Sequence, residues 1–430
     1  MAHSRELSKI SVAENIDRGT LKDLGGIANL DMREVKIAVV NRSEVADVSL
    51  SSGYPHFMAR ALQAHVGEVV YLSPDKSLVT TGIEKGGRTV DRLIFPLLGR
   101  HISGDHHRVL AKRLAYVFGS RLARSGCNVI FGPNAGVEIA SLTTKIPVVL
   151  SSDLTWANMI DYYPGSSSMF AFAKKEGDRI EGAAIRRANA LLYPSKWAAR
   201  TAIEHYGADP ENVHCISWGA NFDADELPSR EEALQHPLGN ELKLLWTGVD
   251  WERKGGPIAC ECLFTLLERG IAARLVVCGC VPPARYRHQQ IEVIPFLNKR
   301  DPIQRQKLSQ LFLKANFFIF PTIAEAFGIV LCEASAHGLP SLVRNTGGVG
   351  GAVIDGVNGY LLSVEANGKN YAEKILEAIQ NRMGYDELVR RSRGAYEERL
   401  NWDAWGRAVR PIFERLVCEG TPLQEHAVPE

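Results

Sequence analysis

Short apolar runs that alternate with helix-compatible stretches constrain the fold of this chain more than any other feature. The runs are rich in β-branched residues and nearly continuous in hydrophobicity, which is typical of parallel strands that are covered on both faces. Longer stretches with a helical pattern, such as residues 106–126 and 196–207, separate several of them. The alternation predicts βαβ units with right-handed crossovers in doubly wound sheets. The expected strands are residues 35–40, 68–72, 128–132, 146–152, 190–195, 213–217, 242–248, 273–279, 291–297, 316–322, 339–344 and 359–362.

The alternation pauses once, in an acidic stretch that contains proline and glycine and is typical of a linker. This linker divides an α/β chain into two Rossmann-like domains, which we expect to face a common crevice. Ligands of such sheets bind in the crevice beyond the carboxyl ends of the strands. The expected segments are an N-terminal extension (1–34), a first domain (35–219), the linker (220–240), a second domain (241–400), and a C-terminal helix and tail (401–430) that returns towards the first domain.

The composition excludes several classes of protein. The chain has 430 residues and a net charge of +1, so no general electrostatic case for nucleic acid arises. No apolar run approaches the roughly 20 residues of a membrane span, and the first residues lack the apolar core of a signal peptide. We therefore expect a cytoplasmic protein with eight reduced cysteines, and we expect no metal because the two C-x-C pairs lack companion histidines.

Two carboxylates, Glu325 and Glu333, stand at the ends of the uncharged run "EAFGIVLCE". On one continuous helix they would lie about 12 Å apart, too far for the acid–base pair of a glycosidase. A loop from Glu325 to Gly328 followed by a helix from Ile329 instead creates an anion site at a helix N-terminus. Glu325 would then lie beside the group attached to a phosphate, and Glu333 would accept hydrogen bonds from a vicinal diol such as a ribose. On spacing alone, a helix-start acid and a solvated helix residue remain the alternative.

The residues around these glutamates read "FPTIAEAFGIVLCEASAHGLPSLVRNTGGVGGAVIDGVNGYLL". The order of E-x7-E, G-x-P turn, glycine pair Gly347–Gly348 and D-G-x-N-G-x-L hairpin closely resembles the retaining glycosyltransferases of family 4, which have the GT-B fold. Residues 193–221 and 244–256 are similar to further parts of that family, and the resemblance covers roughly residues 35–415. It implies metal-independent transfer of a sugar, with retention, from a UDP- or GDP-type donor to an acceptor hydroxyl, without a cofactor.

The resemblance also implies roles for residues of the second domain. Glu325 is the catalytic residue that contacts donor-sugar hydroxyls, Glu333 binds the ribose, and Lys254 in "RKGG" pairs with the diphosphate. A lysine suits that place because its compact charge offsets the anion of the leaving nucleotide. The backbone around the donor sugar and diphosphate, and a residue that borders the base, are matched by Phe327, Gly328, Ile329, Val330 and Asn298.

One position departs from the family pattern. Val249 stands where many relatives carry an arginine. Arg253 is a candidate to supply the missing donor-binding charge, and a solvated cation at a helix start is the alternative.

The first domain offers two more candidates. Gly53 opens a helix just after the first strand and resembles the glycine that lets the backbone approach donor phosphate, with Ser51 and Ser52 as helpers or caps. Asp153 follows another strand, in the place where many relatives carry a histidine, and is a catalytic candidate. Its alternative is the N-cap of a helix that begins in "LTWANMI".

The stretch 100–124 contains six lysines and arginines against one acid, Asp105. Such a helix can lie on anionic lipid at the inner membrane face or hold a phosphorylated acceptor, and a solvated face is the alternative. The expected partners are a nucleotide diphosphate sugar and a glycan, lipid-linked or small-molecule acceptor, without nucleic acid. Two other functions stay open: a GT-B-like nucleotide-sugar epimerase, and a binding module without catalysis, for which Val249 is the only hint.

Overall fold

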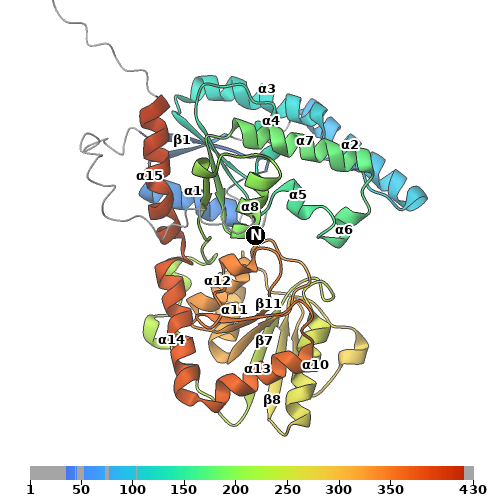
Figure 1. Ribbon diagram of the computed structural model, residues 1–430, viewed down its shortest axis with the longest axis vertical. Coiled ribbons are helices and arrows are strands. Elements are labelled where there is room, and N and C mark those ends of the chain that lie inside the picture. The colour runs from blue at the N-terminus through green and yellow to red at the C-terminus, as the bar shows by residue number, and fades with distance from the viewer. Residues whose placement is uncertain (1–34, 44, 46–52, 73–76, 103, 421–430) are drawn as a thin grey trace, which may run out of the picture.

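Two six-stranded parallel sheets form the framework of the protein, one above the other (Figure 1). The computed structural model describes residues 35–43, 45, 53–72, 77–102 and 104–420. The predictions for residues 1–34, Ser51 and Ser52, and for the tail beyond residue 420, therefore lie outside the described residues. All twelve predicted strands are confirmed as β1 (Lys36–Val40), β2 (Glu68–Leu72), β3 (Val129–Pro133), β4 (Val148–Ser151), β5 (Ala190–Tyr193), β6 (Val213–Cys215), β7 (Leu242–Thr247), β8 (Ala273–Cys278), β9 (Ile291–Ile294), β10 (Phe317–Phe320), β11 (Ser341–Arg344) and β12 (Gly359–Leu362).

In each sheet, the side on which successive strands are added changes once along the chain. The first has the strand order β2-β1-β3-β4-β5-β6 and reverses between β1 and β3. The second has the order β12-β11-β10-β7-β8-β9 and reverses between β7 and β10, where Phe317 pairs with Leu244. The crevice beyond the carboxyl ends of the strands at such a reversal is where open α/β sheets bind ligands. The topology therefore places one candidate site in each domain.

Helices cover both faces of the sheets, because successive strand residues point to opposite sides and both sides are apolar. In β1, Ile37 and Val39 belong to one buried cluster, and Ala38 and Val40 belong to another. The helices are α1 (Tyr54–His65), α2 (Leu78–Leu98), α3 (Arg108–Ser125), α4 (Gly136–Ala140), α5 (Trp156–Met159), α6 (Pro164–Ser167), α7 (Ala171–Arg187), α8 (Lys196–Glu204), α9 (Arg230–Ala233), α10 (Gly256–Glu268), α11 (Pro302–Lys314), α12 (Ile329–Ala336), α13 (Gly368–Gln380), α14 (Arg382–Glu398) and α15 (Trp402–Gly420).

The chain crosses between the domains twice, at one place. It first descends around Ala220, into a segment that contains a short 3-10 helix (Ala224–Glu226) and α9, and it returns between α14 and α15. The two crossings are in contact, because the Ala220 N–H donates to the Leu400 carbonyl (3.0 Å). α15 then packs on α1 and β3 of the first domain, where Trp405 and Phe413 contact the Phe131 ring. The first domain therefore contains both an early and the final part of the described chain (Figure 1).

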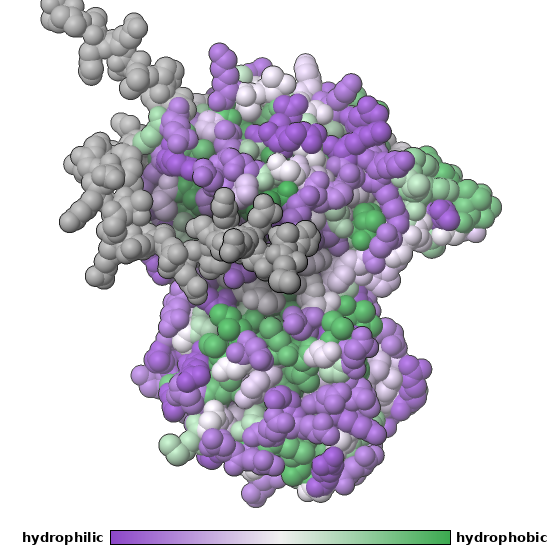
Figure 2. Space-filling model, viewed as in Figure 1, coloured by the Kyte–Doolittle hydropathy of each residue, from purple (hydrophilic) through white to green (hydrophobic). Residues whose placement is uncertain are grey.

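One long helix, α2, does not follow from the strand–helix alternation in the sequence. It projects from the first domain, and a green, apolar lobe stands at the corresponding edge of the surface (Figures 1 and 2). Among the described residues, no helix has both the length and the apolar character needed to cross a bilayer.

Candidate active site

A cleft of about 490 Å³ lies between the carboxyl edges of the two sheets. It opens at the reversal point of the second sheet, where Gly248 and Val249 follow β7 and Glu325 follows β10. The first domain contributes Tyr54, Asn134, Asp153 and Trp218 to its lining. The second domain contributes Thr247, Gly248, Val249, Lys254, Cys278, Gly279, Phe296, Leu297, Lys299, Leu308, Phe312, Phe320, Glu325, Phe327, Gly328, Ile329, Val330 and Glu333.

The predicted joint between a loop and a helix is confirmed, since β10 ends at Phe320 and α12 begins at Ile329. Gly328, the N-cap of α12, has a φ of 86°, a conformation that glycine adopts without strain. Its lack of a side chain also means that it offers no capping hydrogen bond to the helix. Gly328, Ile329 and Val330 line the cleft. The first turn of α12 can therefore direct backbone N–H groups and partial positive charge at an anion.

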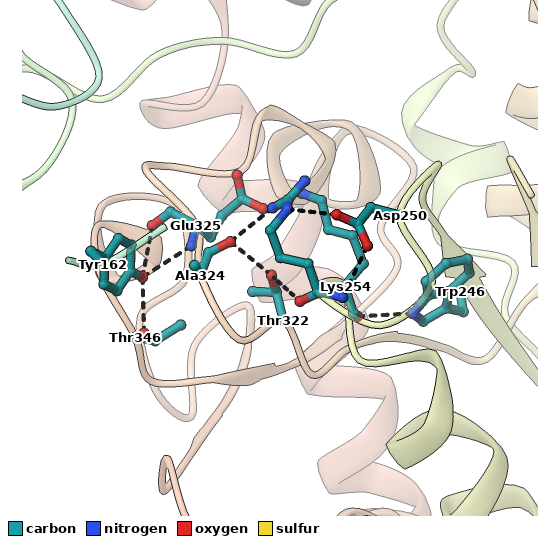
Figure 3. A network of polar contacts seen from close by, with 9 residues as sticks. Tyr162, Trp246, Asp250, Lys254, Thr322, Ala324, Glu325 and Thr346 are labelled. Carbon is teal, nitrogen blue, oxygen red and sulfur yellow. Dashed lines mark hydrogen bonds and ion pairs between the residues drawn. The ribbon is translucent and has the colours of Figure 1, made fainter. Parts of the chain in front are cut away.

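Glu325 forms an ion pair with Lys254 at the centre of the cleft, as Oε2 contacts Nζ (Figure 3). Both side chains are largely buried, with exposed fractions of 13% and 16%. The Lys254 ammonium also lies 4.7 Å from the centroid of the Phe320 ring, which favours a cation. The structure thus brings together two of the three residues predicted to be catalytic.

A tight turn after β7 presents Lys254 to the cleft. The Lys254 N–H donates to the Asp250 carbonyl (3.0 Å), and the Lys254 carbonyl accepts from the Trp246 indole (3.0 Å). Gly255, with a φ of 74°, follows, and a Cβ there would lie 2.1 Å from the Pro321 carbonyl oxygen. Only glycine allows this turn to approach the loop after β10 so closely.

Tyr162 connects Glu325 to the opposite domain. The Glu325 N–H donates to the Tyr162 hydroxyl oxygen (3.0 Å), and the same hydroxyl lies 2.9 Å from the Thr346 hydroxyl (Figure 3). A Cβ at Gly347 would lie 2.2 Å from the Glu325 carbonyl oxygen and 2.3 Å from the Tyr162 hydroxyl. The glycine pair noted in the sequence is therefore needed for the two domains to meet. Nothing in the sequence marks Tyr162, because its contacts are 163 and 184 residues away.

Glu333 is 1% exposed and lines the cleft one turn into α12, so a solvated helix position for it is wrong. The Lys299 ammonium lies 2.5 Å from Glu333 Oε1 and leaves part of its own side chain in solvent. Lys299 was not among the predicted residues, although it follows Asn298 directly. It gives the second carboxylate of the cleft a lysine partner, as Lys254 does for Glu325.

Asn298 is exposed and folds back on its own loop rather than lining the cleft. Its N–H donates to Gln304 Oε1 (2.8 Å), and its Oδ1 accepts from the Arg300 N–H (3.0 Å). The neighbours Phe296 and Leu297 line the cleft instead. The loop that borders the expected base position is thus present, with other side chains facing inwards.

Arg253 points along the rim of the cleft. Its Nε donates to Asp250 (3.2 Å), its Nη1 donates to the Ala324 carbonyl (2.9 Å), and its guanidinium lies over the Tyr163 ring. These contacts fasten the turn after β7 to the loop that carries Glu325. Arg253 is therefore not a free solvated cation, and its role as a donor-binding charge in place of an arginine at Val249, which itself lines the cleft, stays a prediction.

Among the described residues of the first domain that line the cleft, Asp153 is the only carboxylate. It does not cap a helix, because Thr155 is the N-cap of α5 and accepts from the Asn158 N–H. Burial, reinforced by the negative charge of Glu325, raises the pKa of Asp153 to about 6. Near neutral pH this carboxylate is therefore ionised but can take up a proton more readily than an ordinary aspartate.

Gly53 is the N-cap of α1 and has a φ of 82°. The turn brings Tyr54, the first residue of the helix, into the cleft, where its ring stacks on Trp218 with a centroid distance of 4.2 Å. Gly53 itself is not part of the lining. Its predicted approach to a phosphate remains a prediction.

The described residues contain no group of three or more His, Cys, Asp or Glu side chains that could hold a metal ion. The eight cysteines are free thiols, five of them buried. The residues of the C-x-C pairs lie on α10 and at the end of β8. The expectation that the reaction needs no metal stays a prediction.

Comparison with solved structures defines the class of fold. A sucrose-phosphate synthase from Thermosynechococcus elongatus aligns with a TM-score of 0.63 at 14% identity, over 90% of this chain and 100% of that chain. HepE from Anabaena, in complex with UDP and glucose, aligns with a TM-score of 0.57 at 16% identity, over 89% of this chain and 100% of that chain. The predicted GT-B fold is thus confirmed.

Comparison of sequences adds the family context. Residues 236–397 match the family model described as glycosyl transferases group 1. The chain is 30% identical over 216 residues to the D-inositol 3-phosphate glycosyltransferase of Nocardiopsis dassonvillei, which is 47% of this chain and 50% of that protein. The chain spans about half the length of the curated relatives it matches. These matches support a glycosyltransferase of the GT-B fold, most directly through the second domain.

Proposed function

We propose that the protein is a retaining glycosyltransferase of the family 4 type, which transfers a sugar from a UDP- or GDP-type donor to an acceptor hydroxyl. One observation carries this proposal. The Lys254–Glu325 pair and the N-terminus of α12 converge at the reversal point of the second sheet, inside a cleft that the first domain covers. Cations and aligned N–H groups at such a point suit a diphosphate that gains charge as it leaves.

The donor fits the arrangement of the two ion pairs. Its diphosphate would lie against the first turn of α12, and Lys254 would exchange the Glu325 carboxylate for phosphate oxygens. Glu325 would then be free to accept hydrogen bonds from the sugar hydroxyls. Glu333 would likewise accept bonds from the ribose diol, while the partly exposed Lys299 swings away. The UDP that HepE binds supports a nucleotide-sugar donor for this fold.

The transfer step requires one bond to break and one to form at the anomeric carbon. The acceptor oxygen attacks the face from which the diphosphate leaves, and the acceptor proton passes to a departing phosphate oxygen, so the configuration is retained. Lys254 and the α12 N–H groups stabilise the leaving diphosphate, and no metal is needed for that. Asp153 would orient the acceptor hydroxyl from the first domain, and closure of the cleft excludes water.

The acceptor is a glycan, a lipid-linked sugar or a small molecule. The curated relatives act, by their names, on D-inositol 3-phosphate, so an inositol phosphate belongs in the first acceptor panel. The free, mostly buried cysteines fit a reducing compartment, and we expect a cytoplasmic enzyme.

A thermal-shift panel of UDP, GDP, ADP and their sugars identifies the donor, since a ligand at 100 times its Kd adds about 2.7 kcal/mol of stability. The preferred donor is then incubated with and without acceptors, while nucleoside diphosphate release is measured and NMR follows the anomeric configuration. Release with a retained product supports the proposal, and an inverted product contradicts it. An isomerised donor sugar would identify an epimerase, and tight binding without turnover would identify a binding module.

A further inference from the structure

Helix α2 leaves nearly all of its surface uncovered. Of its 21 residues, only Thr80 is buried. The shorter α13 has a similarly amphipathic pattern but buries five residues, among them Tyr371 and Ile375, against the second domain. Amphipathic helices normally gain most of their stability by packing the apolar face. For α2, the described residues cover little of that face, since only Thr80 is buried and Ile83 packs partly against the core of the first domain.

The uncovered face is apolar along the whole helix. Val79, Val90, Leu93 and Leu97 recur on one side of the helix and form the row that we call the α2 stripe, while Ile83, which lies between Val79 and Val90, packs partly against the core of the first domain. Val79, Val90, Leu93 and Leu97 are 58%, 44%, 65% and 81% exposed. The space-filling view shows this end of the first domain as a green projection (Figure 2). A long exposed apolar row of this kind marks an interaction surface.

The contacts of α2 with its domain run along a different edge. The Asp91 carboxylate accepts from the Ile102 N–H (2.7 Å) and contacts His101 Nδ1 (2.9 Å). The Phe95 ring stacks on His101 with a centroid distance of 3.9 Å. These bonds fix the orientation of the helix and leave the α2 stripe facing outwards.

Glycines weaken α2 where the fold does not require them. A Cβ at Gly82 or Gly86 would meet no atom within 4 Å, whereas one at Gly87 would lie 2.1 Å from the Gly104 carbonyl oxygen. Each unneeded glycine costs a helix about 1 kcal/mol relative to alanine. With two such positions and almost no burial, α2 would gain stability from a partner that covers its apolar face.

The charge around α2 identifies the chemistry of its partner. Residues 77–126 contain nine lysines and arginines against three acids, in a chain whose net charge is only +1. Three of these cations, Lys85, Arg88 and Arg92, are exposed on α2, where Arg88 forms an ion pair with Glu84, and the other six lie in residues 100–124. Two copies of this segment would repel each other, while an anionic surface would attract it. The α2 stripe itself contains no aromatic or hydrogen-bonding side chain of the kind that binds nucleic-acid bases.

We propose that α2 docks the protein on an anionic lipid surface, with the α2 stripe in the acyl boundary and its basic residues at the headgroups. This surface differs from the one predicted from the sequence, residues 100–124. There α3 buries Leu110, Leu114 and Phe118 in the domain, and Arg108 pairs with Glu176. We therefore assign the lipid contact to α2, the helix that precedes α3 in the chain.

The C-terminal end of α2 is tied, through His101, to the segment between α6 and α7. The His101 N–H donates to the Ser168 carbonyl (3.0 Å), and the Phe170 N–H donates to the His101 carbonyl (3.0 Å). That segment follows Tyr162, which holds Glu325. The docking itself does not depend on the proposed reaction.

Co-sedimentation of the full chain with vesicles tests the proposal. Vesicles of phosphatidylcholine with about one third phosphatidylglycerol should bind the protein, and vesicles of phosphatidylcholine alone should bind it at least about tenfold less. The double substitution Leu93→Asp with Leu97→Asp should lower binding by at least about tenfold. Ile303→Asp on α11, a residue that is 78% exposed, is the matched control and should bind as the unsubstituted chain does.

A second variant separates the electrostatic part. Charge reversal at Lys85, Arg88 and Arg92 should abolish the preference for anionic vesicles, with an unchanged far-ultraviolet spectrum and Tm. Absence of binding to anionic vesicles, or equal binding by all variants, would overturn the proposal. A dimer in light scattering that the Leu93 and Leu97 substitutions dissolve would overturn it too, because the α2 stripe would then belong to a second copy of the chain.

Discussion

The two domains share one architecture but contribute differently to the cleft between them. The second domain supplies two lysines and two glutamates, paired as Lys254–Glu325 and Lys299–Glu333. From the part of the first domain that the structure describes, the lining residues are one carboxylate, Asp153, together with Tyr54, Asn134 and Trp218. The match to the glycosyltransferase family also lies within the second domain, at residues 236–397. Under the proposed function, the second domain would carry the donor chemistry, while the first would position groups and face the acceptor.

The strongest test of this division removes the cation of the second domain. Lys254→Ala should lower kcat by about 10²–10³, because the leaving diphosphate loses its nearest counter-charge. Initial rates of nucleoside diphosphate release measure the effect. Lys243→Ala, at an exposed position of β7, is the matched control. Turnover of the Lys254 variant within about twofold of the unsubstituted protein would contradict the assignment.

Glu333→Gln tests the far end of the donor. The amide keeps the shape but donates where the carboxylate accepts, so the ribose diol loses part of its binding. KM for the donor should rise about 10- to 100-fold while kcat changes little, as expected of an interaction made equally in the ground state and the transition state. Full donor saturation curves check this. A large loss of kcat at unchanged KM would instead place Glu333 in the transfer step.

The substitution Tyr162→Phe tests how much the first domain contributes to kcat by positioning Glu325. The hydroxyl that holds the Glu325 backbone is lost while the ring remains, and kcat should fall about 5- to 20-fold. Tyr163→Phe is the matched control, since its ring still lies under the Arg253 guanidinium. Equal kcat values for the two variants would remove Tyr162 from the description of the site.

The smallest expected effect concerns Asp153 and pH. Its folded-state pKa of about 6 lies above the usual value of 3.8, so its protonated form is favoured by folding. Its contribution to stability is therefore complete below about pH 4 and is lost as the pH rises through about 6. Asp153→Asn should match the unsubstituted protein near pH 4 and exceed it near pH 7.5, by on the order of 1 kcal/mol because the carboxylate keeps some solvent. Tm values of both proteins across this pH range test the prediction. A difference in stability that does not depend on pH would contradict the raised pKa of Asp153.

The sequence predicts most of what burial and backbone geometry impose locally. The strands are recognisable because both of their faces must be apolar, and the start of α12 follows from Gly328. Although Ser77 and Gly99 cap its two ends, α2 escapes prediction because glycines and Pro96 interrupt its helical pattern and almost none of its residues is buried.

The missed site residues depend on tertiary structure. Tyr162 meets Glu325 only because the domains face each other. Lys299 rather than Asn298 faces the cleft because the loop after β9 folds Asn298 onto Gln304. Arg253 was expected at the phosphate, but Asp250 and the Ala324 carbonyl hold it at the rim. Such choices between neighbouring side chains depend on partners that are distant in sequence.

The two chain crossings at Ala220 and Leu400 have a mechanical consequence. A single connection would let the domains swivel freely, whereas two connections bonded side by side leave one easy axis, which runs through the contact between them. Beside that axis, the rings of Trp402 and Trp218 form a tilted pair with a centroid distance of 6.5 Å, and Trp218 also contacts Phe327 in the cleft. The opening angle of the two halves is therefore coupled to the environment of indole rings, and intrinsic tryptophan fluorescence would record the opening and closing of the cleft without any added label.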